Sequence, residues 1–266
     1  MKSLVLSGPA AAGKSTVGAL VAAALGRPFI DLDEVAAAYY EEAGQPLDDL
    51  IRHIAHVGLV AAHRWWQPAR AHAAVRVIGD HPNTVIAFGA GHSHFEDDVA
   101  AEPVHHALAD CFVVLLLPAA DPEVAHRVLA DRCTQERGEG WGGSTFLLDW
   151  VRSAQNLALA DNVVYTGSRT AGEVAAGVGG QVRRAAHRWP VHPTSATSRC
   201  HSRSILRCLD VSRLARRDDS RQEADRGRTP ARRLALHGEL GAGAVLLQAL
   251  GVGEGFGVAH LAAVHH

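Results

Sequence analysis

The chain has 266 residues, 47% of them hydrophobic, and a formal net charge of −2 at pH 7. This length allows one large domain or two small ones. The near-neutral charge gives no electrostatic case for a nucleic acid or an anionic membrane as partner, and no apolar run is long enough to span a bilayer.

The cysteines and the N-terminus predict a cytoplasmic protein. The four cysteines form no C-x-x-C pair, which favours reduced thiols over a disulfide framework or a zinc site. The first residues run straight into a predicted strand, which leaves no room for a signal peptide.

The first motif lies between the apolar run 4–6 and an Ala-rich helix predicted over residues 17–25. It reads G-x-x-x-x-G-K-[ST], the P-loop or Walker A pattern, in which backbone N–H groups and the positive end of a helix bind phosphate. Lys14 should reach the β- and γ-phosphates, and the Ser15 hydroxyl should bind Mg²⁺. The predicted nucleotide-binding residues are Gly8, Pro9, Ala10, Ala11, Ala12, Gly13, Lys14, Ser15 and Thr16.

Two acids end the next predicted strand, Phe29 to Asp33. Side chains two residues apart in an extended segment face the same way, so Asp31 and Asp33 are expected to face the phosphate site together. One carboxylate can bind Mg²⁺, and the other can hold a substrate hydroxyl for attack on the γ-phosphate. The alternative is that both acids only cap the helix that follows.

The remaining elements alternate between helix and strand. They are predicted as an interrupted helix over 47–78 with a new start at Pro68, a strand over 84–88, a helix from about 97 to 109, a strand over 111–117, a helix starting at Asp121, a helix over 146–160, a strand over 162–165 and a helix from Thr170 to about 188. The strands at 84–88 and 111–117 end in glycine and proline, so neither supplies the Asp that switch-type NTPases place there.

Most of these strands are apolar on both faces, which is typical of a parallel sheet covered on both sides. The sequence therefore predicts an α/β fold, a P-loop NTPase-type three-layer sandwich with a five-stranded parallel sheet. Ligands of such sheets bind beyond the carboxyl ends of the strands. The P-loop, the two acids and Gly89-Ala90-Gly91 all fall at such ends.

A polar segment containing His92, His94, Glu96 and Asp97 follows these glycines. Imidazole and carboxylate groups can bind a metal ion together. A polar loop beside a phosphate site is the commoner explanation, and we adopt it.

The pattern ends near Pro190. Residues 190–233 are rich in Arg, Ser, Thr and Asp, and residues 234–264 are apolar but broken by glycines. Such segments bury little regular surface. We expect residues 1–188 to form the folded domain and residues 189–266 to be an irregular extension, disordered or non-native, with a basic interaction arm as the alternative.

In their order and spacing, these motifs resemble the shikimate kinase family over residues 1–185. The resemblance rests on the P-loop, on Phe29-x-Asp31-x-Asp33, on the strand leading to Gly89-x-Gly91, on the run 111–117 with the Pro/Glu-started helix after it, and on residues 169–174. It implies an ATP-dependent kinase domain that uses Mg²⁺ and phosphorylates a hydroxyl of a small molecule.

The resemblance also implies site residues. Asp31 and Asp33 would act with Lys14 in catalysis, Arg132 would flank the adenine, and Arg137 would be the lid arginine in catalysis. The implied acceptor-binding residues are Asp33, Arg64, Gly89, Ala90, Gly91 and Arg152.

Several positions depart from the family pattern, and the lid lacks the usual Arg-Pro pair. Ala90 interrupts its triple glycine, Gln67 replaces an acid, and Asn156 replaces a tyrosine. Shikimate as the acceptor therefore does not follow. A nucleotide, a sugar acid or an antibiotic are alternatives on the same fold, and a regulatory protein that only binds or hydrolyses ATP is the alternative from another class.

Overall fold

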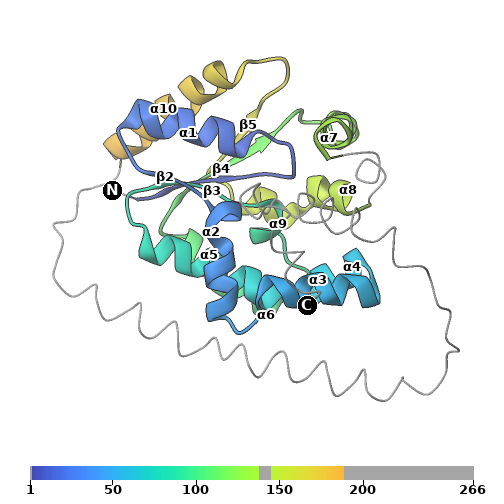
Figure 1. The fold of residues 1–266 in the computed structure, drawn as a ribbon. Coiled ribbons are helices and arrows are strands. Elements are labelled where there is room, and N and C mark those ends of the chain that lie inside the picture. The colour runs from blue at the N-terminus through green and yellow to red at the C-terminus, as the bar shows by residue number, and fades with distance from the viewer. Residues whose placement is uncertain (1, 138–144, 189–266) are drawn as a thin grey trace, which may run out of the picture.

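The computed structural model describes residues 2–137 and 145–188 of the chain (Figure 1). The elements are β1 (Leu4–Ser7), α1 (Lys14–Leu25), β2 (Phe29–Asp31), α2 (Leu32–Glu42), α3 (Leu47–Val57), α4 (Leu59–Trp65), α5 (Gln67–Asp80), β3 (Val85–Ala87), the short 3-10 turn η1 (Ala90–His92), α6 (Asp98–Leu108), β4 (Phe112–Leu117), α7 (Pro122–Arg137), α8 (Thr145–Arg152), α9 (Ala154–Ala158), β5 (Asn162–Tyr165) and α10 (Ala171–Arg188). The predicted extension 189–266 lies outside the described residues.

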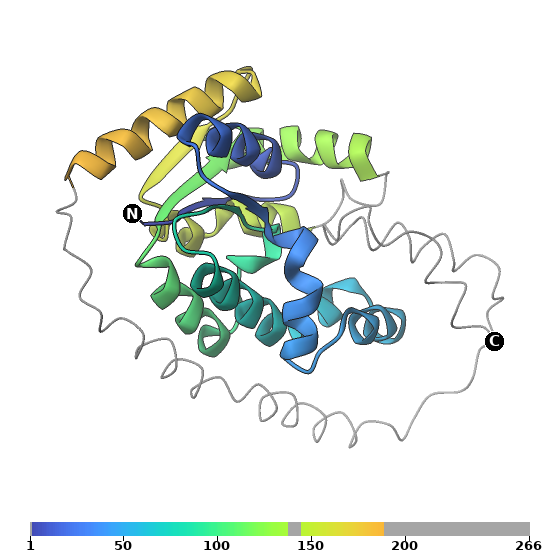
Figure 2. The ribbon, with the colours of Figure 1, turned by 60° about the vertical axis from the view of Figure 1, so that its left-hand side comes forward.

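The five strands form one parallel sheet in the order β2-β3-β1-β4-β5. Helices α1 and α10 lie on one face and α2, α5 and α6 on the other, as Figures 1 and 2 show. This arrangement confirms the predicted three-layer α/β sandwich. The register pairs Leu6 with Ala87 and Ala87 with Asp31, so the carboxyl ends of β1, β3 and β2 meet at one edge.

The two faces of the sheet carry separate cores because alternate residues of a strand point to opposite sides. Val5 and Ile86 pack with Leu32, Trp66 and other buried residues under α2, α5 and α6. Their strand neighbours, among them Leu4, Leu6 and Val85, pack with residues of α1, α7 and α10. Burial on both faces explains why the strands read as continuous apolar runs.

Two predicted boundaries are changed by local structure, one by a side-chain cap and one by a glycine. The Asp31 carboxylate accepts a hydrogen bond from the N–H of Asp33, and α2 therefore begins at Leu32. The expectation that the strand continues to Asp33 is wrong. The predicted interrupted helix over 47–78 is three helices, broken at Gly58, whose φ is +83°, and again at Trp66. The predicted new start at Pro68 is confirmed, since α5 begins at Gln67 with this proline in its first turn.

Two predicted helix starts are confirmed. The Asp121 carboxylate accepts from the N–H groups of Glu123 and Val124 at 2.9 Å each. At α10, the Thr170 N–H donates to the Glu173 carboxylate at 2.8 Å, and the Glu173 N–H donates back to the Thr170 hydroxyl at 3.3 Å. This reciprocal pair is a capping box.

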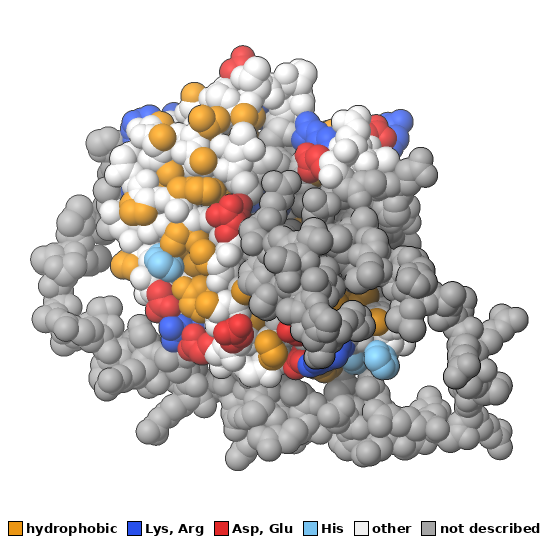
Figure 3. All heavy atoms as spheres, in the orientation of Figure 1, with side chains coloured by type: hydrophobic (Ala, Val, Ile, Leu, Met, Phe, Trp, Pro, Cys, Tyr) orange, Lys and Arg blue, Asp and Glu red, His pale blue; other side chains and the backbone are white. Residues whose placement is uncertain are grey.

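The surface offers no single dominant feature on the face drawn in Figure 3, where acidic, basic and apolar side chains of the described residues are interspersed. Across residues 2–137 and 145–188, none of the helices is both long and apolar enough to cross a membrane.

In the part of the chain that the structure describes, the buried residues of both cores lie within residues 4–182, and we expect a chain that ends at Arg188 to fold without residues 189–266. Its melting temperature should stay within about 3 °C of the full chain, which corresponds to roughly 1 kcal/mol for a domain of this size. Differential scanning calorimetry of the two chains checks this. A drop of 10 °C or more would show that the C-terminal residues contribute to the core.

Candidate functional site

The loop between β1 and α1 has the shape of a phosphate cradle. Gly13 precedes α1 with φ +88°, and Ala11 has φ +57°, which is uncommon for a residue with a Cβ. A Cβ on Gly8 would lie 2.7 Å from the carbonyl oxygen of Leu116 on β4, so only glycine fits there. Successive N–H groups of such a loop face inward and can bind an anion.

Lys14, the first residue of α1, lies over this loop. Its side chain is buried, and its Nζ donates a hydrogen bond to the Pro9 carbonyl at 2.8 Å. Ser15 and Thr16 follow in the first turn of α1 and are exposed, and that turn contains no acidic side chain. The positive end of α1 is therefore not neutralised from within the helix.

Arg132 on α7 lies beside the same loop. Its guanidinium donates to the Ala11 carbonyl at 3.3 Å. Arg137, the last residue of α7, has a side chain that lies outside the described part of the structure. The predicted catalytic role of Arg137 stays a prediction.

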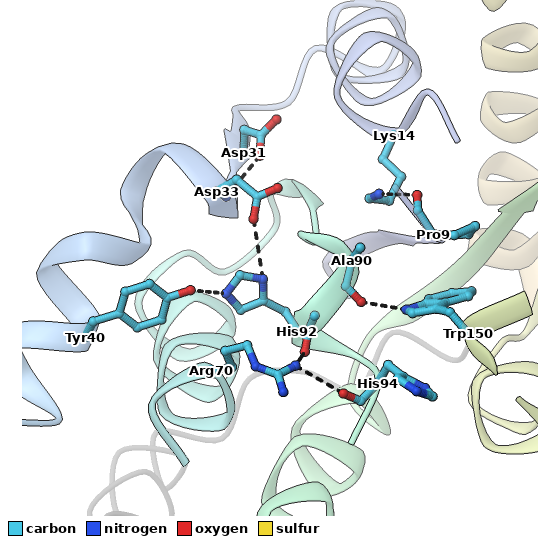
Figure 4. A network of polar contacts seen from close by, with 11 residues as sticks. Pro9, Lys14, Asp31, Asp33, Tyr40, Arg70, Ala90, His92, His94 and Trp150 are labelled. Carbon is cyan, nitrogen blue, oxygen red and sulfur yellow. Dashed lines mark hydrogen bonds and ion pairs between the residues drawn. The ribbon is translucent and has the colours of Figure 1, made fainter. Parts of the chain in front are cut away.

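The two acids differ in environment because one is the last residue of a strand and the other is helical. Asp31 is buried at the end of β2 and caps α2, whereas Asp33 lies in the first turn of α2 with a side chain 23% exposed. Strand geometry therefore does not align them as expected. Figure 4 shows that the Asp33 carboxylate points toward His92, while Asp31 turns back toward the backbone of Asp33.

Gly89, the residue two positions after β3, makes room for the Asp33 carboxylate. A Cβ on Gly89 would lie 1.8 Å from Asp33 Oδ1 and 2.5 Å from His92 Nδ1. Its backbone has φ −61° and ψ 153°, which any residue adopts, so this glycine is required by space and not by conformation.

His92 on η1 is buried between Asp33 and Tyr40. Its Nε2 lies 2.8 Å from the Tyr40 hydroxyl and its Nδ1 lies 3.6 Å from Asp33 Oδ1. Burial, with a contribution from the Arg70 cation, lowers the pKa of His92 to about 3. The imidazole is therefore neutral at pH 7.

Arg70 on α5 fixes the backbone that follows β3. It is buried, and its guanidinium donates to the carbonyls of Gly91, His94 and His63, the last two at 3.1 Å. Burial lowers the pKa of Arg70 to about 10, so it remains charged at pH 7. Trp150 on α8 holds the same turn from the other side, since its Nε1 donates to the Ala90 carbonyl at 2.6 Å (Figure 4).

Four further side chains lie in the site that the sequence did not predict as site residues: Tyr40, Arg70, His92 and Trp150. The sequence gives a weak indication of a special role for Arg70, because it is a charged residue within the Ala-rich run 69–74. The sequence marks His92 only as a residue of a polar loop and as a candidate metal ligand. Tyr40 and Trp150 lie 52 and 60 positions from the residues that they contact, and no local pattern marks them.

The two arginines implied as acceptor ligands pair with glutamates in the structure. Arg64 Nε lies 2.7 Å from Glu96 Oε2, and Arg152 pairs with Glu123 of α7. Both side chains are more than half exposed. Arg152 is two residues after Trp150, about 200° around the helix, so it points away from the side on which Trp150 reaches Ala90.

The hydrogen bonds of Gln67 explain why an amide, and not a carboxylate, fits at this position. Gln67 Oε1 accepts from the N–H groups of Glu96 and Asp97 at 2.7 and 3.1 Å, and its Nε2 donates to the Arg64 carbonyl at 3.2 Å. A carboxylate could not make the last of these bonds.

The histidines after β3 are engaged in hydrogen bonds with neighbouring side chains. His94 Nδ1 lies 3.2 Å from the Asn156 amide, and His92 contacts Tyr40. Among residues 2–137 and 145–188, no group of three or more His, Cys, Asp or Glu side chains is arranged to hold a metal ion.

Comparison with known proteins agrees with this geometry. The family model of shikimate kinase matches residues 10–52, which contain most of the P-loop and both acids. The shikimate kinase from Acinetobacter baumannii in complex with shikimate superposes with a TM-score of 0.50 at 19% identity, over 69% of this chain and 94% of that chain. The resemblance to the shikimate kinase family is confirmed.

The shikimate kinase from Aquifex aeolicus is also similar, with a TM-score of 0.47 at 19% identity, over 69% of this chain and 98% of that chain. No curated protein matches the chain. Within the shikimate kinase fold, the structure brings Lys14, Asp31, Asp33 and the segment Gly89–Gly91 to one edge of the sheet (Figure 4).

The crowding at Gly89 predicts a specific defect. In Gly89→Ala the Asp33 carboxylate must turn away, at a cost of about 1–3 kcal/mol of stability, as for other overpacked sites. Gly79→Ala is the matched control, because a Cβ there meets nothing within 4 Å and alanine favours the helix by up to about 1 kcal/mol. Urea unfolding of both variants checks this, and equal stabilities would contradict the crowded geometry.

Proposed function

We propose that the protein is an ATP-dependent kinase that transfers the γ-phosphate of ATP to a hydroxyl of a small molecule, with residues 1–188 as its kinase domain. The observation that carries the proposal is the meeting of a P-loop and a carboxylate, Asp33, at the same sheet edge. The matched family model, which is that of a small-molecule kinase, supports the same reading.

The P-loop would bind the phosphates of ATP. Its cradle is shaped by Gly8 and Gly13, and Lys14 lies over it with its Nζ on a loop carbonyl that phosphate oxygens can replace. Lys14 would neutralise the charge of the β- and γ-phosphates, and Thr16 would continue the phosphate contacts at the start of α1. Arg132, beside the loop, would flank the adenine.

Ser15 and Asp31 would hold Mg²⁺. Their hydroxyl and carboxylate are oxygen donors, which this hard cation prefers, and Ser15 is exposed at the phosphate end of α1. When bound, Mg²⁺ supplies charge neutralisation on the phosphate oxygens.

Asp33 would act on the acceptor. Its carboxylate accepts the proton of the acceptor hydroxyl as the hydroxyl oxygen forms a bond to the γ-phosphorus and the bond between phosphorus and the ADP oxygen breaks. Partial exposure of the side chain allows an acceptor to approach. The backbone of Gly89, Ala90 and Gly91, held rigid by Arg70 and Trp150, would line the other side of the acceptor.

Arg64 and Arg152 would bind an acidic group of the acceptor only after exchanging a glutamate partner. The exchange costs little, because exposed ion pairs are worth about 0–1 kcal/mol. The acceptor is therefore a shikimate-like acid or another hydroxylated molecule such as a nucleotide, a sugar acid or an antibiotic.

An acceptor panel tests this proposal. ADP release from Mg²⁺ and ATP is measured with cyclitols, shikimate, sugars, nucleosides and aminoglycosides. We expect at least one to raise the rate above that without acceptor, and we expect Lys14→Ala to abolish the increase, because the neutralising cation is lost. If no compound raises the rate, a regulatory ATP-binding protein is favoured instead.

Asp33→Asn should separate chemistry from nucleotide binding. The amide cannot take the hydroxyl proton, so kcat with the active acceptor should fall by about 10²–10⁴-fold, the usual contribution of a general base. Affinity for ATP, measured by calorimetry, should stay within about 2-fold of the parent, since the role proposed for Asp33 is toward the acceptor hydroxyl and is exerted in the transition state. An unchanged kcat would remove Asp33 from the mechanism.

A further inference from the structure

The contact of His92 with Asp33 has no part in the function proposed above. We infer that His92 is a positioning residue: its Nδ1–H orients the Asp33 carboxylate for the acceptor hydroxyl, and the Tyr40 hydroxyl sets the imidazole tautomer that makes this possible. The inference rests on the proposed role of Asp33.

The tautomer follows from the two neighbours of the ring. Nδ1 faces the Asp33 carboxylate at 3.6 Å, and a carboxylate only accepts hydrogen bonds. A bare nitrogen lone pair there would face negative charge, so the proton of the neutral ring belongs on Nδ1. Nε2 then accepts from the Tyr40 hydroxyl at 2.8 Å, which has a proton to give.

The ring cannot turn away from Asp33. The His92 N–H donates to the Gly89 carbonyl at 3.0 Å, and the ring lies parallel to Tyr40 and edge-on to Phe88. On the other side, Arg70 holds the carbonyls of Gly91 and His94. Contacts from α2, from α5 and from the segment that follows β3 therefore fix one buried imidazole.

Nδ1 of His92 is buried and has no hydrogen-bond partner of ordinary geometry, although the Gly89 carbonyl lies near the ring as a second acceptor beside Asp33. A buried donor that lacks a partner costs about 1–3 kcal/mol, which favours closure of the 3.6 Å gap to Asp33. Catalytic hydrogen bonds are often long before substrate binds and shorten in the complex. The missing Cβ of Gly89 leaves the space in which the two groups can meet.

A neutral imidazole orients Asp33 without cancelling its charge. The pKa of His92 is lowered mainly by burial and also by the cations of Arg70 and Lys14. The carboxylate therefore keeps its capacity to accept a proton from the acceptor, while one of its oxygens is directed at the ring. A protonated histidine in this place would weaken the base.

Two substitutions at position 92 separate orientation from packing. In His92→Asn the amide nitrogen takes roughly the place of Nδ1 and can still donate to Asp33. In His92→Gln the amide reaches roughly the place of Nε2, so it can keep the Tyr40 contact but loses the donor to Asp33. The larger glutamine fills the site better, so a purely structural role predicts the opposite order of damage.

The kinetic test measures ADP release from Mg²⁺ and ATP with shikimate and with water as the two acceptor probes. We expect His92→Gln to lower kcat by about 10-fold or more, within the range of a general base, and His92→Asn to stay within about 3-fold, both with unchanged KM for ATP. Tyr40→Phe should lower kcat in the parent and add nothing in His92→Asn, because the two contacts act through one ring.

The results distinguish the positioning role of His92 from the catalytic role proposed for Asp33. If Asp33→Asn turns over either probe like the parent, the proposed role of Asp33 fails. If Asp33→Asn is inactive while His92→Gln equals or exceeds His92→Asn, Asp33 keeps its role and the positioning inference is overturned.

Nitrogen-15 NMR of the full chain and of its Asp33→Asn variant decides the case in which neither probe is turned over or a variant at position 92 does not fold. We expect a proton on His92 Nδ1 at pH 7 and a shift of that resonance in Asp33→Asn. A proton on Nε2, or no shift, would overturn the inference.

Discussion

The Asp33 carboxylate occupies the space where a side chain on Gly89 would begin, and the rest of the site depends on that contact. A Cβ there would lie 1.8 Å from Asp33 Oδ1. The contact joins the first turn of α2 to the end of β3, which the sheet register places beside β1 and its P-loop. The pairing of these three strands therefore places the phosphate-binding loop and Asp33 at the same edge of the sheet.

A buried cation keeps this edge rigid without contributing a ligand. Arg70 donates hydrogen bonds to three backbone carbonyls around η1, and in the described structure it forms no ion pair with a carboxylate. Its charge helps to keep His92 neutral. Trp150 holds the Ala90 carbonyl from α8, so the turn is held from both sides. Preorganised polar groups of this kind need no rearrangement when charge develops during reaction.

The sequence was sufficient for what depends on local pattern. Apolar runs indicated the five strands, the loop predicted to bind phosphate lies between β1 and α1 as expected, and the caps at Asp121 and Thr170 are confirmed. Asp33 was misplaced into a strand because the capping bond from Asp31 ends β2 two residues early. Tyr40, Trp150 and the glutamate partners of Arg64 and Arg152 meet the site across about 30 to 60 positions, and only the packed fold reveals such pairs.

We propose that the P-loop and Asp33 form one catalytic centre. A crystal structure of the full chain with Mg²⁺ and a non-hydrolysable ATP analogue tests it most directly. We expect the γ-phosphate to lie between Lys14 Nζ and the Asp33 carboxylate, with Mg²⁺ on the Ser15 hydroxyl. A γ-phosphate directed away from Asp33, with that carboxylate out of reach of any acceptor beside it, would show that the two do not form one centre.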